Sequence, residues 1–333
     1  MARIATTTIQ TALDRWNPPD IVNIGPFFND LVRQILVATL FGDTVLDDQE
    51  QEQTETAIRG AFGFMEKSLW VSWFPNWLIS GRAAFLAVGA TLDRLIYSII
   101  DERRKHAAGS DLLGMLIAVR DEDDGTGMDS KQLRDEVMTM FLAGHETTAI
   151  AATWLFPLLD EHPIVLGQLL EEIATLGGRT PTFADLSHLP YTRPVIDELL
   201  RVAPPVWLYY RTPLTADRLR NHAVEAGSTV LLSPYLTHRH PAFWSNPTVF
   251  DPDRGTPEDK KVMHPCAYFP FSGGKRRCIG NECAIMEVVF ITVMVLQRWT
   301  LTRTGPSMPR PLVTLRPAQN NAIGAWMHIQ ARS

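Results

Sequence analysis

The chain has little of what marks a secreted, membrane-spanning or nucleic-acid-binding protein. Only 3 of its 333 residues are cysteine, which is too few for a secreted disulfide framework. No stretch of about 18 uncharged apolar residues occurs, so we expect no membrane anchor. Acidic residues outnumber basic ones by 37 to 31, so no basic excess indicates a nucleic-acid partner. The first residues lack the apolar core of a signal peptide, and a cytoplasmic location is the expectation.

What the chain does contain is typical of a globular protein. Apolar residues make up 45% of the sequence and charged residues 20%, which is enough to form a buried core. The 21 glycines and 23 prolines are scattered without a period, which excludes fibrous repeats. We find no linker, and we therefore expect a single domain over residues 1–333, α-rich over 1–205 and β-containing over 206–333.

Helical periodicity dominates the first two thirds of the sequence. Asp129 followed by Gln132 has the spacing of a helix N-terminus, and a long helix is expected from there to about Leu159, bent near Pro157. The short aromatic segment Trp70 to Leu78 is expected to form a loop. Further helices are predicted over Phe27–Phe41, Ala83–Lys105, from Pro163 to Gly177, and Tyr191–Arg201.

The pattern changes after residue 205. Short runs at 206–212, 218–224 and 229–232 are predicted strands, and residues 246–270 have no period and are expected to be irregular. A helix is predicted from about Cys278 to Arg298, and strand-like runs follow at 312–315 and 325–329. The fold class is therefore mainly α with a small β part.

The most specific motif is Phe271-Ser-Gly-Gly-Lys-Arg276-Arg-Cys278-Ile-Gly280. Its five spaced positions resemble the heme-binding signature of the cytochromes P450, a match expected by chance in roughly one chain in ten thousand of this length. The resemblance implies heme b (iron protoporphyrin IX), with Cys278 as the axial iron ligand and Arg276 paired to a propionate. The glycines of the motif would allow a tight turn.

Two other readings of this segment stay open at the level of sequence. Cys278 could be a structural cysteine in a glycine-rich turn. Alternatively, zinc could be bound by four candidate ligands, although no Cys-x-x-Cys pair is present. These candidates are His264, Cys266, Cys278 and Cys283.

A second motif lies in the middle of the predicted long helix. The run from Ala143 to Thr148 resembles the oxygen-activation motif of the same family. In that reading Gly144 lets a flat ligand lie close to the helix, and Glu146 with Thr147 forms an acid–alcohol pair that passes protons. Taken alone, the run is more often a surface glutamate and threonines bonded to their own backbone.

The family resemblance extends to residues that hold the fold together. Glu198 and Arg201 match the family's Glu-x-x-Arg, and Arg254 supplies the third member of that cluster. Arg211 resembles a second propionate-binding arginine. Val206 and Trp207 correspond to a segment that lines the substrate pocket.

The resemblance runs from about Asp111 to the end of the chain and more loosely back to residue 1. Family chains are longer, so it implies a chain without the N-terminal quarter of the fold. It also implies a monomeric monooxygenase that hydroxylates or epoxidises a small apolar substrate with dioxygen. Electrons would come from a separate ferredoxin or flavodoxin, attracted by the basic residues at 275–277. The alternative is a truncated, non-catalytic remnant that binds heme poorly or not at all.

Overall fold

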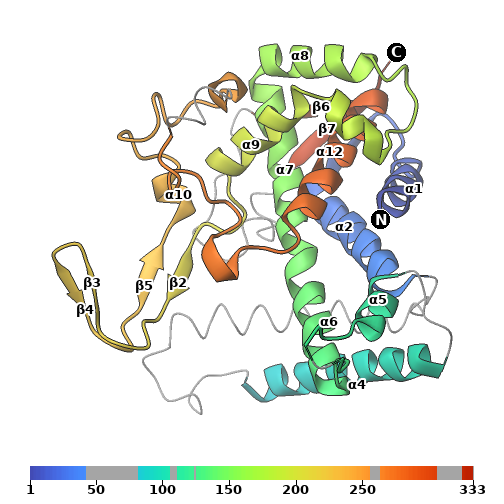
Figure 1. The fold of residues 1–333 in the computed structure, drawn as a ribbon. Helices are drawn as coiled ribbons and strands as arrows, with labels where there is room; N and C mark the ends of the chain where they lie inside the picture. The colour runs from blue at the N-terminus through green and yellow to red at the C-terminus, as the bar shows by residue number, and fades with distance from the viewer. Residues whose placement is uncertain (43–81, 106–110, 124, 256–262, 306–324, 333) are drawn as a thin grey trace. The chain divides into compact units, whose positions relative to one another are not determined.

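The computed structural model describes residues 1–42, 82–105, 111–123, 125–255, 263–305 and 325–332 (Figure 1). Two compact units make up the chain. The first unit consists of Met1 and residues 32–146, and the second unit consists of residues 2–31 and 147–333. The predictions for residues 70–78 and 312–315 lie outside the described residues.

The first unit is helical. It contains the C-terminal part of α2 (Ile24–Phe41), α4 (Arg82–Lys105), α5 (Leu112–Ala118) and α6 (Ser130–Gly144). The predicted N-terminus of α6 is confirmed, because the Asp129 carboxylate accepts a hydrogen bond from the amide of Gln132 at 2.7 Å. Asp111 caps α5 in the same way and also pairs with Arg103 at the end of α4, at 2.6 Å. Capping of this kind satisfies amides that the helix itself leaves free.

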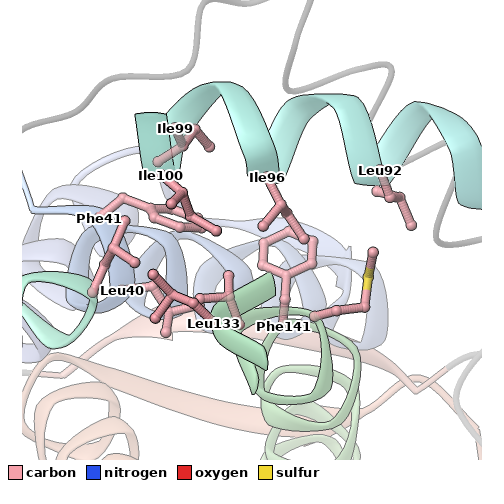
Figure 2. Packing of buried hydrophobic residues seen from close by; sticks show 11 residues of the cluster. Leu40, Phe41, Leu92, Ile96, Ile99, Ile100, Leu133 and Phe141 are labelled. Carbon is pink, nitrogen blue, oxygen red and sulfur yellow. The ribbon is translucent and has the colours of Figure 1, made fainter. Parts of the chain in front are cut away.

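Apolar side chains from these four helices form one core (Figure 2). Figure 2 shows Ile96 of α4 close to Phe141 of α6. Burying an aliphatic or aromatic side chain of this size stabilises the fold by about 1.5–3 kcal/mol. The buried members are Leu40, Phe41, Leu92, Ile96, Ile99, Ile100, Leu113, Leu133, Val137, Met138 and Phe141.

The predicted long helix from Ser130 to Leu159 is divided in the structure. Helix α6 ends at Gly144 and α7 spans Glu146–Glu161, with a turn at His145. The ring Nδ1 of His145 donates to the carbonyl of Phe141 at 3.1 Å, the acceptor that an α-helix gives to the amide of residue 145. Pro157 does not end α7, which continues to Glu161.

The second unit is built around α12 (Asn281–Arg298), which is buried on every side from Ile285 to Leu296. Helices α1 (Ala2–Leu13), α8 (Pro163–Ala174) and α9 (Thr192–Val202) pack against it. The antiparallel strands β1 (Asp20–Asn23), β7 (Trp326–Ala331) and β6 (Trp299–Arg303) form a sheet in the order β1-β7-β6. In this register Ile329 lies between Asp20 and Leu301.

Two small antiparallel pairs complete the second unit. β2 (Tyr209–Arg211) pairs with β5 (Val230–Leu232), and β3 (Asp217–Leu219) pairs with β4 (His222–Val224). The single strand predicted over 218–224 is wrong, because Arg220 adopts φ +53° and turns the chain into a hairpin. The short helices are α10 (Pro234–Thr237), η2 (Phe183–His188), η3 (Pro252–Gly255) and η4 (Gly274–Arg276).

The remaining sequence predictions agree with the described elements within a few residues. Gly177 and Gly178 both adopt positive φ, which explains why the chain leaves the helical path after α8. No single helix in the described ranges is long and apolar enough to cross a membrane. Residues 130–161 and 163–174 reach that length and apolarity only as a bent pair.

Candidate functional site: the Cys278 loop

The loop that carries Cys278 is a closed turn between η4 and α12. The amide of Cys278 donates to the carbonyl of Phe271 at 2.9 Å, and the amide of Arg277 donates to the carbonyl of Gly274 at 3.1 Å. Gly274 adopts φ +64°, a conformation that a residue with a side chain rarely takes. The Cys278 thiol lies exposed at the end of this turn. The loop therefore presents one sulfur from a backbone that its own hydrogen bonds hold.

Gly280 has a different role from Gly274. Its φ is −88°, which any residue adopts, so the backbone of the turn does not require a glycine here. A Cβ at position 280 would lie 3.9 Å from the Sγ of Cys278. The glycine therefore keeps the space beside the sulfur free of a side chain.

Two basic residues belong to the region of this loop. Arg211, at the end of β2, donates to the Ser272 hydroxyl at 2.9 Å and to the carbonyl of Tyr210 at 2.8 Å. The predicted propionate ligand Arg276 lies in η4 and is exposed. Two cationic groups thus belong to the same loop region as the thiol, one anchored and one free to adapt to an anion.

This donor set fits heme better than zinc. Heme iron needs one protein thiolate and cationic partners for its propionates, and the loop offers both. Zinc in a structural site needs four ligands, whereas the residues that the structure describes hold no group of three or more metal-ligating side chains. The zinc alternative built on His264, Cys266, Cys278 and Cys283 therefore has no ligand cluster to support it.

The Glu198–Arg201–Arg254 cluster lies next to this region in the second unit. Arg201 donates to both carboxylate oxygens of Glu198, at 2.7 and 2.8 Å, and Arg254 donates to Oε1 at 3.1 Å. Arg201 is 1% exposed and Glu198 is 4% exposed. The structure thus brings together three residues that the sequence separates by up to 56 positions.

The guanidinium of Arg201 also holds three backbone carbonyls. It donates to His238 at 2.8 Å, Pro247 at 2.7 Å and Val249 at 2.8 Å. With the two bonds to Glu198, each of its five N–H groups has a bond available to it. A charge buried this deeply needs such a complete set of partners, and the result is a fixed geometry for the chain between α9 and η3.

The oxygen-activation residues lie at the boundary between the units. Gly144 and Glu146 belong to the first unit, and Thr147 belongs to the second unit. Glu146 is buried and Thr147 is half-buried. A Cβ at Gly144 would lie 3.2 Å from Leu36, so close packing in the first unit is a second reason for a glycine there. Their part in oxygen chemistry stays a prediction.

The candidate pocket residues Val206 and Trp207 are half-buried in the segment before β2. The Trp207 carbonyl accepts a hydrogen bond from the Ser233 hydroxyl at 2.8 Å. This bond fixes the backbone of the segment. A role of the two side chains in binding substrate stays a prediction.

The sequence reading missed two residues that hold the entry to the Cys278 loop. The hydroxyl of Tyr209 donates to the carbonyl of Pro270 at 2.7 Å, and the ring of His238 accepts from the amide of Phe269 at 2.9 Å. Burial, followed by the charge of Cys278, raises the pKa of Tyr209 to about 12. The pair His238-Arg239 resembles the family in sequence, but no local pattern shows what His238 or Tyr209 holds, because both act on a segment more than 30 positions away.

A mostly helical fold that presents one thiol from a glycine-containing loop is the arrangement of the heme-thiolate class. The family model "Cytochrome P450" matches residues 2–322, so the chain belongs to the cytochrome P450 family. It is 39% identical over 232 residues to cyclooctatin synthase of Streptomyces melanosporofaciens. This match covers 68% of this chain and 50% of that protein. It is 31% identical over 311 residues to pentalenene oxygenase of Streptomyces avermitilis. This match covers 91% of this chain and 68% of that protein.

Solved structures give the same fold. The cytochrome P450DA heme domain matches 99% of this chain with a TM-score of 0.88 and 27% identity, and this match covers 73% of that domain. The retinoic acid-bound cyanobacterial CYP120A1 matches 98% with a TM-score of 0.85 and 25% identity, covering 74% of that chain. The fold class is thus confirmed. The chain spans about half to two thirds of the length of the curated relatives named above.

Proposed function

We propose that the chain is a heme-thiolate monooxygenase that holds heme b through Cys278. The bound heme would supply dioxygen activation, with one oxygen atom going into a C–H or C=C bond and the other to water. Electrons would come from a separate ferredoxin or flavodoxin-type donor. The protein's own part is to hold the cofactor, exclude water, orient the substrate and deliver protons.

The observation that carries this proposal is the exposed Cys278 thiol at the end of a closed loop. The 2.9 Å bond from its amide to Phe271 sets the direction of the residue before any cofactor arrives. Gly280 leaves the space beside Sγ open. Arg211 and Arg276 would pair with the two propionates, since guanidinium groups bind carboxylates in a planar, charge-assisted manner.

Proton delivery is assigned to the neighbours Glu146 and Thr147. The carboxyl of Glu146 would supply a proton, and the hydroxyl of Thr147 would pass it to the reacting oxygen. A buried acid and an adjacent alcohol suit this task, because both groups can donate and accept in turn.

The substrate class we propose is a small, cyclic, apolar molecule. The names of two relatives denote oxidation of an alkene or alkenol, pentalenene and cyclooctat-9-en-7-ol. The half-buried Val206 and Trp207 would contact the apolar part of such a ligand. For the electron donor, the exposed Lys275, Arg276 and Arg277 offer a basic surface suited to an acidic partner.

The test is the spectrum of the ferrous–CO complex after reconstitution with heme. The chain should give the red-shifted Soret band of thiolate ligation, and Cys278→Ala should abolish it. Cys266→Ala and Cys283→Ala are matched controls that should keep the band. If Cys278→Ala keeps it, the ligand assignment is wrong; if the unmodified chain takes up no heme, the non-catalytic alternative replaces this proposal.

A further inference from the structure

The chain enters the Cys278 loop through a segment held by aromatic rings that are buried or half-buried. The Phe269 amide donates to Nε2 of His238 at 2.9 Å, and the next carbonyl, that of Pro270, accepts from the Tyr209 hydroxyl at 2.7 Å. Two residues of the segment are thus fixed through their backbone, independently of their own side chains. Both bonds come from elements distant in sequence, so they fix the position of the segment in the fold rather than the conformation of a turn.

A third ring strengthens the same segment from within. The hydroxyl of Tyr268 donates to the carbonyl of Asp197 in α9 at 2.9 Å, and burial raises the pKa of Tyr268 well above its ordinary value. The His238 ring packs on Tyr268 and Phe269, with centroid distances of 5.1 and 5.3 Å. These contacts pack the imidazole against two rings of the segment that its Nε2 holds.

The hydrogen bond determines the state of the imidazole. An amide can only donate, so Nε2 must carry a lone pair and the neutral ring must hold its proton on Nδ1. His238 is fully buried. Burial, opposed by the carbonyls of Arg201 and Leu200, lowers the pKa of His238 to about 4. The ring is therefore a neutral acceptor at physiological pH.

His238 also connects the loop to the arginine cluster. Its carbonyl accepts from the guanidinium of Arg201 at 2.8 Å. Its ring holds Phe269, whose carbonyl in turn accepts from the amide of Ser272 at 3.1 Å, inside the loop. A continuous path of hydrogen bonds thus runs from the Glu198–Arg201 pair through one residue to the loop that presents Cys278.

We propose that His238 is a positioning residue for Cys278: its neutral, Nδ1-protonated ring accepts the Phe269 amide and transmits the rigidity of the Arg201 cluster to the loop. The link between this placement and heme binding rests on the proposed function. The placement itself concerns the chain's own backbone and holds with or without the cofactor.

The experiment measures amide hydrogen exchange of Phe269 and the alkylation rate of the Cys278 thiol in the full chain without added heme. His238→Gln places a side-chain acceptor where Nε2 lies, whereas His238→Asn is polar and of similar size but reaches only the position of Nδ1. We expect His238→Asn to raise exchange at Phe269 by roughly 5- to 100-fold, the effect of losing one buried hydrogen bond. His238→Gln should stay close to the unmodified chain.

Alkylation should follow the same order, with Cys278 faster in His238→Asn than in His238→Gln and the rate at Cys283 equal in both. His188→Asn, at an exposed histidine in η2, is the matched control and should change neither readout. Equal Phe269 exchange in the Gln and Asn variants, whether slow or fast, would overturn the proposal. Failure of the unmodified chain to bind heme would overturn the proposed function instead, and would leave the exchange result interpretable.

Discussion

Arg201 and Glu198 form a doubly hydrogen-bonded ion pair, at 2.7 and 2.8 Å, with only 1% and 4% of their side chains exposed. One turn of α9 brings them to the same face, and the packing of the second unit removes both from water. A pair in this setting adds little net stability compared with apolar residues, but the loss of one partner leaves an uncompensated charge. The pair is therefore a strong constraint on the geometry of the unit.

Glu198→Gln should lower the free energy of unfolding by about 3–5 kcal/mol, because the guanidinium of Arg201 stays buried without its counter-charge. Denaturant unfolding followed by circular dichroism measures the change. Arg193→Gln, which removes a partly exposed i,i+4 pair with Asp197 on the same helix, should cost no more than about 1 kcal/mol. Equal losses in the two variants would contradict this view of the cluster.

Glu287 should make stability depend on pH. It is buried in α12, and burial raises its pKa from 4.5 to about 8. Between these values the folded chain holds a proton that the unfolded chain has released, so the free energy of unfolding should fall as pH rises through this window. The full loss is on the order of 5 kcal/mol, and the contribution levels off above pH 8.

Glu287→Gln should remove this slope, since an amide does not ionise in the window. Chemical denaturation at a series of pH values between 5 and 9 gives the comparison. Glu282→Gln, at an exposed acid in the first turn of α12, serves as the control and should keep the slope of the unmodified chain. If the free energy of unfolding of Glu287→Gln still falls with pH, the pH dependence comes from other groups.

Thr147→Ala should uncouple electron use from product formation. If the hydroxyl passes protons to the reacting oxygen, its loss slows that step by about 10²–10⁴-fold, and reducing equivalents then leave as peroxide. Peroxide and product are measured per electron consumed. Thr153→Ala in α7 is the matched control, because the Thr153 hydroxyl already donates to the carbonyl of Ala149 at 2.7 Å. Unchanged product per electron in Thr147→Ala would end this assignment.

Phe141→Ala should destabilise the first unit. Phe141 is 3% exposed within the core shown in Figure 2, and a ring removed from such a site leaves a cavity that costs about 3–5 kcal/mol. Denaturant unfolding with a probe in the first unit measures the loss. Met115→Ala, at a largely exposed position in α5, should change stability by less than about 0.5 kcal/mol. A small effect at Phe141 would mean that the core repacks around the gap.

Local sequence patterns explain why some helices are predictable and why one was missed. Apolar residues at helical spacing identified α2 and α4, and the acceptor at Asp129 identified the start of α6. The first helix, α1, went unpredicted because its threonines have weak helix propensity. In the structure the hydroxyls of Thr6 and Thr8 donate to carbonyls four residues back. Ile9 and Leu13 are buried on the inner face of α1.

Where the periodicity failed, one side-chain hydrogen bond and one backbone conformation inside the predicted segments decided the outcome. His145 interrupts the helix predicted through it by bonding to Phe141 with its side chain, and Arg220 turns a predicted strand into a hairpin. Both are choices of backbone conformation made at a single residue. A periodicity argument does not resolve such a choice, because it counts apolar positions and not individual hydrogen bonds.

The sequence by itself determined the family, the mainly helical class and the identity of Cys278 as the candidate iron ligand, because motif spacing is a property of the chain that survives without coordinates. Only the tertiary structure decided that Arg254 joins Glu198 across 56 residues and that His238 holds the amide of Phe269. The physical reason is the range of the interactions. Spacing reports neighbours within a helix turn or a loop, whereas a buried hydrogen bond between distant segments exists only once the core has excluded water from both.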